Sequence, residues 1–255
     1  MTTRVKVATI NLHSRADRWK ERRHLLTAQI VEAVPDLIGL QELHLPLRQG
    51  KWLCKQVNLR LTGTEKKPYK LVQKRYQHLV NGYFEGIGVL SRLPVLYHDG
   101  IGLGNGGRVA LRIHVELPSH QTMDFVCTHL HHVAAEKEAR LEQAMKLVGW
   151  LQSHKHVPIQ VIAGDLNEPP DGLAVHYIKQ SFRSAFEAVH GRDPLATFST
   201  ALTISDRPAV CLDYILVSPA VRRVSSATLF CKKPGREDDT LFPSDHVGVL
   251  ATLEV

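Results

Sequence analysis

The chain has 255 residues, of which 44% are hydrophobic and 22% are charged, and its formal net charge is +7 with histidine counted as neutral. This apolar fraction is ordinary for a globular protein and is enough to bury a sizeable core. No run of about 18 apolar residues is present, so we expect no membrane span. The modest positive charge favours an anionic partner such as phosphate, nucleic acid or an acidic membrane surface, although a solvated basic surface explains it equally well.

The first eleven residues predict a β-strand, because Val5, Val7 and Thr9 alternate with other residues. They contain no apolar segment followed by a small-residue cleavage site, so no signal peptide is predicted. The four cysteines lie far apart in the sequence and form no CxxC pair. We therefore expect mostly buried thiols in a reducing compartment, the cytoplasm.

A helix and a short strand are predicted next. Leu26, Ile30 and Val34 recur at a spacing of four within Asp17 to Val34, and Pro35 ends the pattern. Leu37 to Leu40 then has the composition of a short buried strand. A second helix is predicted much later, from Glu136 to Gln152, with Leu141, Met145, Val148 and Leu151 on one face.

Several further segments read as strands, and four polar segments read as loops. The predicted strands are Ile87 to Leu90, Val109 to Val115, Asp124 to Leu130, Ile159 to Ala163, Asp213 to Val217 and Val247 to Val255. The predicted loops are Gln49 to Gln77, Leu103 to Gly107, Ser199 to Pro208 and Lys232 to Phe242. Many strands with few helices favour two sheets packed face to face with helices outside, an α/β (α+β) fold. No linker or repeat divides the chain, so we expect a single domain over residues 1–255.

Short polar clusters stand at the ends of the predicted strands. These clusters are Asn11-Leu12-His13, Gln41-Glu42, Thr128-His129, Gly164-Asp165-Leu166-Asn167, Asp213 and Ser244-Asp245-His246. A strand end holds a side chain rigidly at the rim of a sheet, where several can converge. Each cluster alone is a weak signal, since Gly-Asp after a strand is often only a turn.

The residue types in these clusters suit phosphoryl transfer. Mg²⁺ prefers hard oxygen ligands, which Glu42 and Asp245 can supply with Asn11 in support. Asp165 or His246 can orient a water molecule and take its proton. Developing charge on phosphoryl oxygens needs donors, and three side chains qualify: Asn167, His129 and a protonated His246. The sequence has neither a nucleophilic serine elbow nor a P-loop.

With Gly88-Val89-Leu90-Ser91-Arg92 and Leu212-Asp213-Tyr214-Ile215, these clusters span nearly the whole chain in one order. In that order the chain resembles the endonuclease/exonuclease/phosphatase superfamily of DNase I-like phosphoesterases. The resemblance implies a four-layer αββα sandwich with the site at one edge of the two sheets. It also implies a hydrolase that depends on Mg²⁺, with Mn²⁺ as a substitute.

The resemblance further implies a role for each matching residue. Glu42 would be the main metal ligand, with Asn11 and Asp245 beside the metal. Asp165 would orient or deprotonate water, and Asn167 would hold both Asp165 and the phosphate. Which of Asp165 and His246 is the base, and whether one or two metals bind, stays open.

The same resemblance assigns supporting residues around two histidines. His246 would meet the phosphate, and Asp213 would accept a hydrogen bond from its other ring nitrogen. His129 would contact the phosphate or the leaving oxygen, and Glu85 resembles the carboxylate that backs it.

Two positions depart from the pattern of the superfamily. Cys211 stands where many members have a basic residue, a loss that Arg108 or Arg207 can compensate. His44 stands where nuclease members often have lysine or arginine, although it can still donate to a phosphate. We therefore expect His44 and Arg108 to bind substrate. The basic run Lys66, Lys67, Lys70, Lys74 and Arg75 is interpreted as a solvated loop, with a substrate-facing patch as the alternative.

Three functions follow from these observations. The first is a phosphodiesterase or nuclease that acts on nucleic acid. The second is a phosphatase or phosphodiesterase for a small-molecule or lipid head-group ester. The third, a non-catalytic binding module, is disfavoured because the full set of site residues is present. The sequence makes no prediction of oligomeric state.

Overall fold

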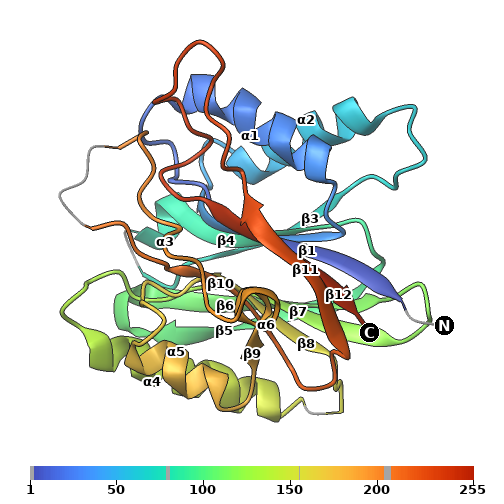
Figure 1. The fold of residues 1–255 in the computed structure, drawn as a ribbon, viewed down its shortest axis with the longest axis vertical. Helices are drawn as coiled ribbons and strands as arrows, with labels where there is room; N and C mark the ends of the chain where they lie inside the picture. The colour runs from blue at the N-terminus through green and yellow to red at the C-terminus, as the bar shows by residue number, and fades with distance from the viewer. Residues whose placement is uncertain (1–2, 79–80, 155, 204–207) are drawn as a thin grey trace.

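The computed structural model describes residues 3–78, 81–154, 156–203 and 208–255, and it has two six-stranded sheets packed face to face (Figure 1). The first sheet has the order β11 (Arg223–Phe230), β12 (Gly248–Glu254), β1 (Arg4–Asn11), β2 (Leu37–His44), β4 (Glu85–Ser91) and β3 (Lys70–Arg75). The second has the order β5 (Val95–Gly104), β6 (Arg108–Glu116), β7 (Thr122–His129), β8 (Gln160–Asp165), β10 (Asp213–Val217) and β9 (Arg183–Ser184).

Helices cover both outer faces of this sandwich. Helices α1 (Trp19–Ala33) and α2 (Gln49–Leu61) lie on the first sheet, and α4 (Lys137–Gln152) and α5 (Leu173–Lys179) lie on the second (Figure 1). The short elements are α3 (Asn81–Phe84), a 3₁₀ turn (Asn105–Gly107) and α6 (Ala185–His190). The predicted four-layer αββα sandwich is therefore confirmed.

Three hydrophobic clusters hold the four layers together. The central cluster lies between the sheets and includes Val7 and Phe125. The other two lie under the helices, one with Ile10 beneath α1 and α2 and one with Leu147 of α4 over Ile162. Strands such as β1 are buried on both faces, and alternate side chains enter different clusters, which explains their nearly continuous apolar runs.

Strand pairing brings the polar strand ends together at one rim. β1 and β2 are parallel, with Asn11 opposite Gln41, and β7 and β8 are parallel, with His129 opposite Asp165. β10 runs antiparallel to β8 and places Asp213 opposite Asp165. Side chains that are far apart in the sequence therefore share one edge of the sandwich.

One predicted loop was wrong. Residues 49–77 contain helix α2 and strand β3. The helix buries Gly50, Leu53, Val57 and Leu61 at helical spacing, but most of its other positions are polar and Leu59 is exposed. β3 pairs only with β4, and as an edge strand it is largely exposed, which explains its basic composition.

Other local predictions were partly right. The helix expected from residue 136 to 152 is α4, but Met145 is exposed because the buried face runs through Ala144, Leu147, Val148 and Leu151. In the predicted loop from Leu103 to Gly107, Leu103 and Gly104 instead end strand β5, and Asn105–Gly107 form a 3₁₀ turn. Residues 199–203 and 208 form neither helix nor strand, and residues 204–207 lie outside the described part of the chain.

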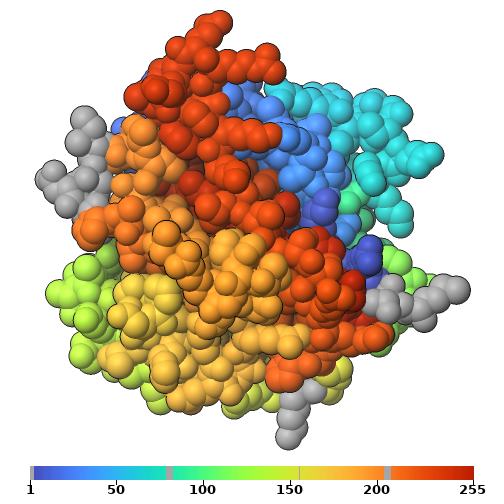
Figure 2. Space-filling view, in the orientation of Figure 1, coloured from blue at the N-terminus to red at the C-terminus, as the bar shows by residue number. Residues whose placement is uncertain are grey.

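The predicted loop between β11 and β12 is confirmed and packs on α1. Lys233 donates its backbone N–H to the Gln29 side chain at 3.0 Å, and Arg18 pairs with Asp238 at 2.7 Å. Figure 2 shows this red segment standing against the blue helix at one end of the molecule.

The four cysteines are free thiols, and three of them are buried, as the sequence predicted. Among the described residues, no helix is long and apolar enough to cross a membrane.

Candidate active site

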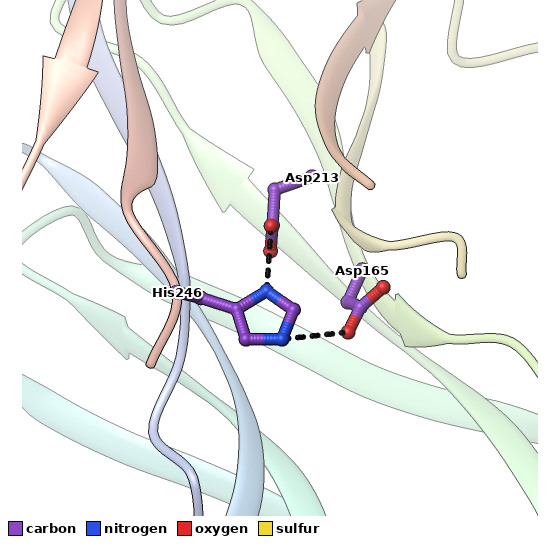
Figure 3. Close-up of side chains that lie close together, drawn as sticks. All are labelled: Asp165, Asp213 and His246. Carbon is purple, nitrogen blue, oxygen red and sulfur yellow. Dashed lines mark hydrogen bonds and ion pairs between the residues drawn. The ribbon is translucent and has the colours of Figure 1, made fainter. Parts of the chain in front are cut away.

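A buried acid–histidine–acid group stands at the shared rim of the sheets (Figure 3). His246 donates from Nδ1 to Asp213 Oδ2 at 2.8 Å, and its Nε2 lies 3.8 Å from Asp165 Oδ2. Asp213 opens β10 and Asp165 ends β8, so the two carboxylates come from paired strands. His246 lies just before β12 of the other sheet, and the group therefore bridges the two sheets.

The neighbouring charges in this group change the pKa values of Asp165 and His246. Burial raises the pKa of Asp165 above its usual range, and Asp213 raises it further, while His246 opposes both effects. Burial alone would lower the pKa of His246. The carboxylates of Asp213 and Asp165 outweigh burial and raise that pKa well above its usual value. The geometry therefore favours a protonated His246 beside a carboxyl group that is more basic than an ordinary aspartate.

Asn11 links this group to Glu42. Its side-chain nitrogen donates to Asp165 Oδ2 at 3.0 Å and to Glu42 Oε1 at 3.1 Å. Glu42 reaches this position through an irregularity in the β2–β4 pairing between Leu40 and Leu43, and it has a left-handed backbone with φ of 54°. Such strained residues collect at functional sites, where they re-aim a side chain.

Asp245 completes the carboxylate cluster and is held by His13. Its Oδ2 lies 3.0 Å from His13 Nδ1, and its Oδ1 accepts from Ser244 Oγ at 3.2 Å. Burial alone would raise the pKa of Asp245, but the contacts with His13 and His246 lower it. The Asp245 side chain is therefore held ionised beside Asn11, whose carbonyl oxygen accepts from Ser244 Oγ at 2.6 Å.

His129 lies on the other side of Asp165, and donors face both of its ring nitrogens. Nδ1 is 2.9 Å from Arg108 Nη1 and 2.8 Å from the Tyr76 hydroxyl. Nε2 is 2.8 Å from the Asn167 amide nitrogen and 3.5 Å from Asp165 Oδ2. Burial lowers the pKa of His129, and the Arg108 guanidinium lowers it further, so the ring is neutral.

Asn167 also contacts Asp165 directly. Its backbone N–H donates to Asp165 Oδ1 at 2.8 Å, and its φ of 49° is left-handed. The turn after β8 therefore fixes the orientation of Asp165.

Glu85 and His44 lie on neighbouring strands of the first sheet, whereas His129 ends β7 of the second. They pair across β4 and β2 and line an open pocket of about 420 Å³ with Ser14, Arg15 and Phe84. Burial and the neighbouring Glu42 raise the pKa of Glu85. The expected Glu85 backing of His129 is not what the structure has, because Tyr76 and Arg108 occupy that ring nitrogen.

The sequence of residues 8–246 matches the model of the endonuclease/exonuclease/phosphatase family. The chain belongs to this family. A comparison with curated protein sequences found no significant match.

Solved structures agree with the family assignment. An endonuclease/exonuclease/phosphatase from Bacteroides vulgatus superimposes with a TM-score of 0.77 at 19% identity, covering 99% of each chain. The human Nocturnin catalytic domain with bound sulfate has a TM-score of 0.78 at 20% identity, covering 99% of this chain and 95% of that one. Truncated Caenorhabditis elegans TDP2 has a TM-score of 0.77 at 18% identity, with 99% and 98% covered. At these identities the likeness establishes the fold.

Sequence reasoning missed several contacts of this family member's site. Tyr76 follows β3 inside the segment that was predicted as a loop, and its hydroxyl reaches His129. Phe198 packs its ring 5.0 Å from that of His246, although the sequence around it carries no motif. His13 was noted only as a flanking residue, and its contact with Asp245 was not predicted. Arg207, named as a substitute for a basic residue at Cys211, lies outside the described residues.

Two groups of side chains are candidates for a metal site. Asp165, Asp213 and His246 offer ligand atoms within 4.8 Å of one another. That group suits Mg²⁺ poorly, because a protonated His246 has no free lone pair and Mg²⁺ prefers oxygen ligands. The half-buried Glu42 and the buried Asp245 offer carboxylate oxygens instead, and both act electrostatically on His13. The Asn11 side chain lies beside them, with its nitrogen donating to Glu42 and its amide oxygen accepting from the His13 backbone N–H at 2.9 Å. The repulsion that Glu42 exerts on Glu85 marks this side as the one where negative charge collects.

Proposed function

We propose that this family member is a divalent-metal-dependent phosphodiesterase that uses water to cleave a P–O bond. The observation that carries the proposal is the position of Asp165. Its Oδ2 lies between the Asn11 amide, at 3.0 Å, and the ring nitrogens of His129 and His246, at 3.5 and 3.8 Å. A buried carboxyl group with a raised pKa among three donors is a suitable base for a water molecule.

The proposed roles follow from charge and hydrogen bonding. Asp165 takes a proton from the attacking water. The water oxygen bonds to phosphorus, and the bond between phosphorus and the leaving oxygen breaks. The protonated His246, held by Asp213, donates to a phosphoryl oxygen, where negative charge develops. Glu42, Asp245 and Asn11 would hold Mg²⁺. The bound ion would supply positive charge for the phosphoryl oxygens.

His129 acts in this scheme as a neutral donor. A neutral imidazole has one acceptor nitrogen, yet Arg108 and Asn167 offer donors to both. The guanidinium has no acceptor in any orientation, whereas the amide of Asn167 can turn its oxygen toward the ring by giving up its 3.1 Å hydrogen bond to the Leu130 carbonyl oxygen. We therefore place the proton on Nε2, where it can be donated to the phosphate or the leaving oxygen.

Nucleic acid is the favoured class of substrate because unpaired cations stand near the site. Arg48, Lys51 and Arg75 line a pocket of about 350 Å³ together with Leu45, which follows His44 in the chain. None of the three forms an ion pair with any residue that the structure describes. If all three contact phosphates of a strand, log affinity should fall with log salt with a slope of about −2 to −3. A small phosphoester should show a much weaker salt dependence.

The experiment is a panel of phosphomonoesters, phosphodiesters, DNA and RNA, assayed with Mg²⁺, with Mn²⁺ and with chelator. We expect diester cleavage that chelation abolishes and that either ion restores. Glu42→Gln should raise the Mg²⁺ concentration that gives the half-maximal rate by at least roughly 10-fold. Altering even an outer-shell partner of a metal typically lowers metal affinity by that factor. The exposed Glu65→Gln is the matched control. Full activity in metal-free protein would refute metal dependence, and no cleavage of any ester would refute the proposed function.

A further inference from the structure

Residues 197–200 form a short connecting segment between the chain that leads into β10 and the chain that leads into β12. Phe198 pairs in antiparallel fashion with Val210 on one side and with His246 on the other. The backbone N–H of Phe198 donates to the Val210 carbonyl oxygen at 3.0 Å, and the Val210 N–H donates back at 2.6 Å. The connecting segment therefore joins the two sheets at the rim where the acid–histidine–acid group lies.

The connecting segment also holds the backbone on both sides of His246. The carbonyl oxygen of Asp245 accepts from the Thr200 N–H at 2.8 Å. On the other side, the Val247 N–H donates to the Thr197 carbonyl oxygen at 2.6 Å. His246 is thus fixed through its two neighbours in the chain, and its place relative to the second sheet depends on this segment.

The Thr197 hydroxyl holds the backbone of Asp213, the partner of His246. Its Oγ1 accepts from the Asp213 N–H at 3.1 Å and from the Leu212 N–H at 2.9 Å. β10 pairs with β8 along one side, whereas β9 pairs with its other side at residues 216 and 217, away from Asp213. At Asp213 a side chain therefore takes the place of a partner strand. A hydroxyl oxygen has two lone pairs, and these two N–H groups use both.

We propose that Thr197 is a positioning residue, which sets the separation between the Asp213 carboxylate and the His246 ring. Those two side chains share a 2.8 Å hydrogen bond but come from different sheets, so strand pairing within either sheet does not fix their separation. Thr197 binds the backbone of Asp213 through its hydroxyl and that of Val247 through its carbonyl oxygen. It is 2% exposed, so bulk water does not replace these bonds. This inference rests on the proposed function and adds a residue that lies outside the polar strand ends.

The test uses a graded series of side chains at position 197. Thr197→Val removes the hydroxyl and keeps the branched shape, Thr197→Ser keeps the hydroxyl, and Thr197→Cys supplies a thiol, which is a weaker acceptor. With bis(p-nitrophenyl) phosphate and saturating Mg²⁺, Thr197→Val should lower kcat on the order of 10²-fold, the loss that a small misplacement causes. Its KM should stay within about twofold, because the lost alignment matters in the transition state.

The other two variants complete the series. Thr197→Ser should have a kcat within about threefold of the wild type, because the two N–H groups keep their acceptor. Thr197→Cys should lie between serine and valine, and it keeps the test open if the valine variant does not fold.

A second readout does not need activity. The Nδ1 proton of His246 is hydrogen-bonded to Asp213, so its NMR resonance should lie far downfield in the wild type. It should move upfield or broaden in Thr197→Val and return in Thr197→Ser. Thr27→Val is the matched control, because the Thr27 hydroxyl is also buried and donates to a backbone carbonyl oxygen, that of Arg23 at 2.7 Å in α1. The control should leave both kcat and the resonance unchanged.

The outcomes separate this inference from the proposed function. A folded Thr197→Val with wild-type kcat, or with an unchanged His246 resonance, would show that the hydroxyl only satisfies two buried N–H groups, and would overturn the inference. A loss that serine does not restore, or that falls on KM, would also overturn it. If the wild type cleaves no diester, the proposed function fails, and the resonance decides by itself. Movement in Thr197→Val with recovery in Thr197→Ser would support positioning, and equal resonances in all variants would reject it.

Discussion

The pair formed by His246 and Asp213 gives the sharpest test of the proposed chemistry. Their 2.8 Å hydrogen bond is buried, and Asp213 Oδ1 has no hydrogen-bond partner among the described residues. His246→Ala removes a donor aimed at developing charge, a loss that costs on the order of 10²–10³ in turnover, or about 2.7–4 kcal/mol. Asp213→Asn should have a comparable effect, because a neutral amide no longer stabilises the protonated ring.

If Asp213 acts only through His246, the two effects will not multiply. We expect the double variant to be within about threefold of His246→Ala, since residues that act as a unit are not additive. The assay is turnover of a chromogenic diester at saturating Mg²⁺. Multiplicative losses would show that Asp213 has an independent role, such as binding the metal. Near-normal turnover in folded His246→Ala would remove His246 from the mechanism.

Unfolding in urea provides a second readout of the same cycle. His246→Ala leaves the Asp213 carboxylate buried without its partner, and breaking a buried pair costs about 3–5 kcal/mol. Asp213→Asn in that background removes the uncompensated charge. The double variant should therefore be more stable than His246→Ala while being no more active. Equal stability of the two proteins would contradict the assigned pairing.

Further predictions concern His129 and the packing of the β8 rim. In ¹⁵N NMR, neutral His129 should carry its proton on Nε2, and Arg108→Gln should raise its pKa; a proton on Nδ1 in the wild type would refute the tautomer. The folded-state pKa of His129 is lowered, so the neutral ring contributes to stability above its ordinary pKa of about 6.5, and this contribution is lost as the pH falls. Acidification toward pH 5 should therefore reduce the free energy of unfolding more in the wild type than in Arg108→Gln. Gly164→Ala would place a Cβ 2.1 Å from the Thr128 carbonyl oxygen and should destabilise the protein by about 1–3 kcal/mol. Gly149→Ala in α4, where a Cβ would have nothing within 4 Å, should stabilise it by up to about 1 kcal/mol. Equal unfolding midpoints for these two variants would contradict the packing argument.

The fold was largely predictable because its strands are buried on both faces. The two-faced burial of β1, β8 and β10 leaves apolar runs that end abruptly at polar residues, and the rim is built from those ends. The edge element β3 and the helix α2 were missed for the opposite reason. Much of their surface faces solvent, so their polar residues hide the periodicity that marks a strand or a helix.

The site was predictable only as a set of residues, and its contacts were not. Motif order indicated Asp165, Asp213 and His246, because each stands at the end of a recognisable strand. It could not indicate that Tyr76 replaces Glu85 at the ring of His129. That contact depends on how the chain leaves an exposed edge strand, and no periodic pattern encodes the path of such a segment.

The two histidines beside Asp165 are buried to a similar degree but differ in charge. Both rings are almost fully buried, and burial alone would lower the pKa of each. His129 has a guanidinium as its neighbour, which adds to burial and keeps the ring neutral. His246 lies between two carboxylates, which reverse the effect of burial and keep the ring charged. Groups whose environments separate their pKa values in this way take different roles in catalysis. A neutral donor on one side of Asp165 and a cationic donor on the other would face different oxygens of one phosphodiester. This asymmetry fits a reaction in which the leaving oxygen and the phosphoryl oxygens develop negative charge to different extents.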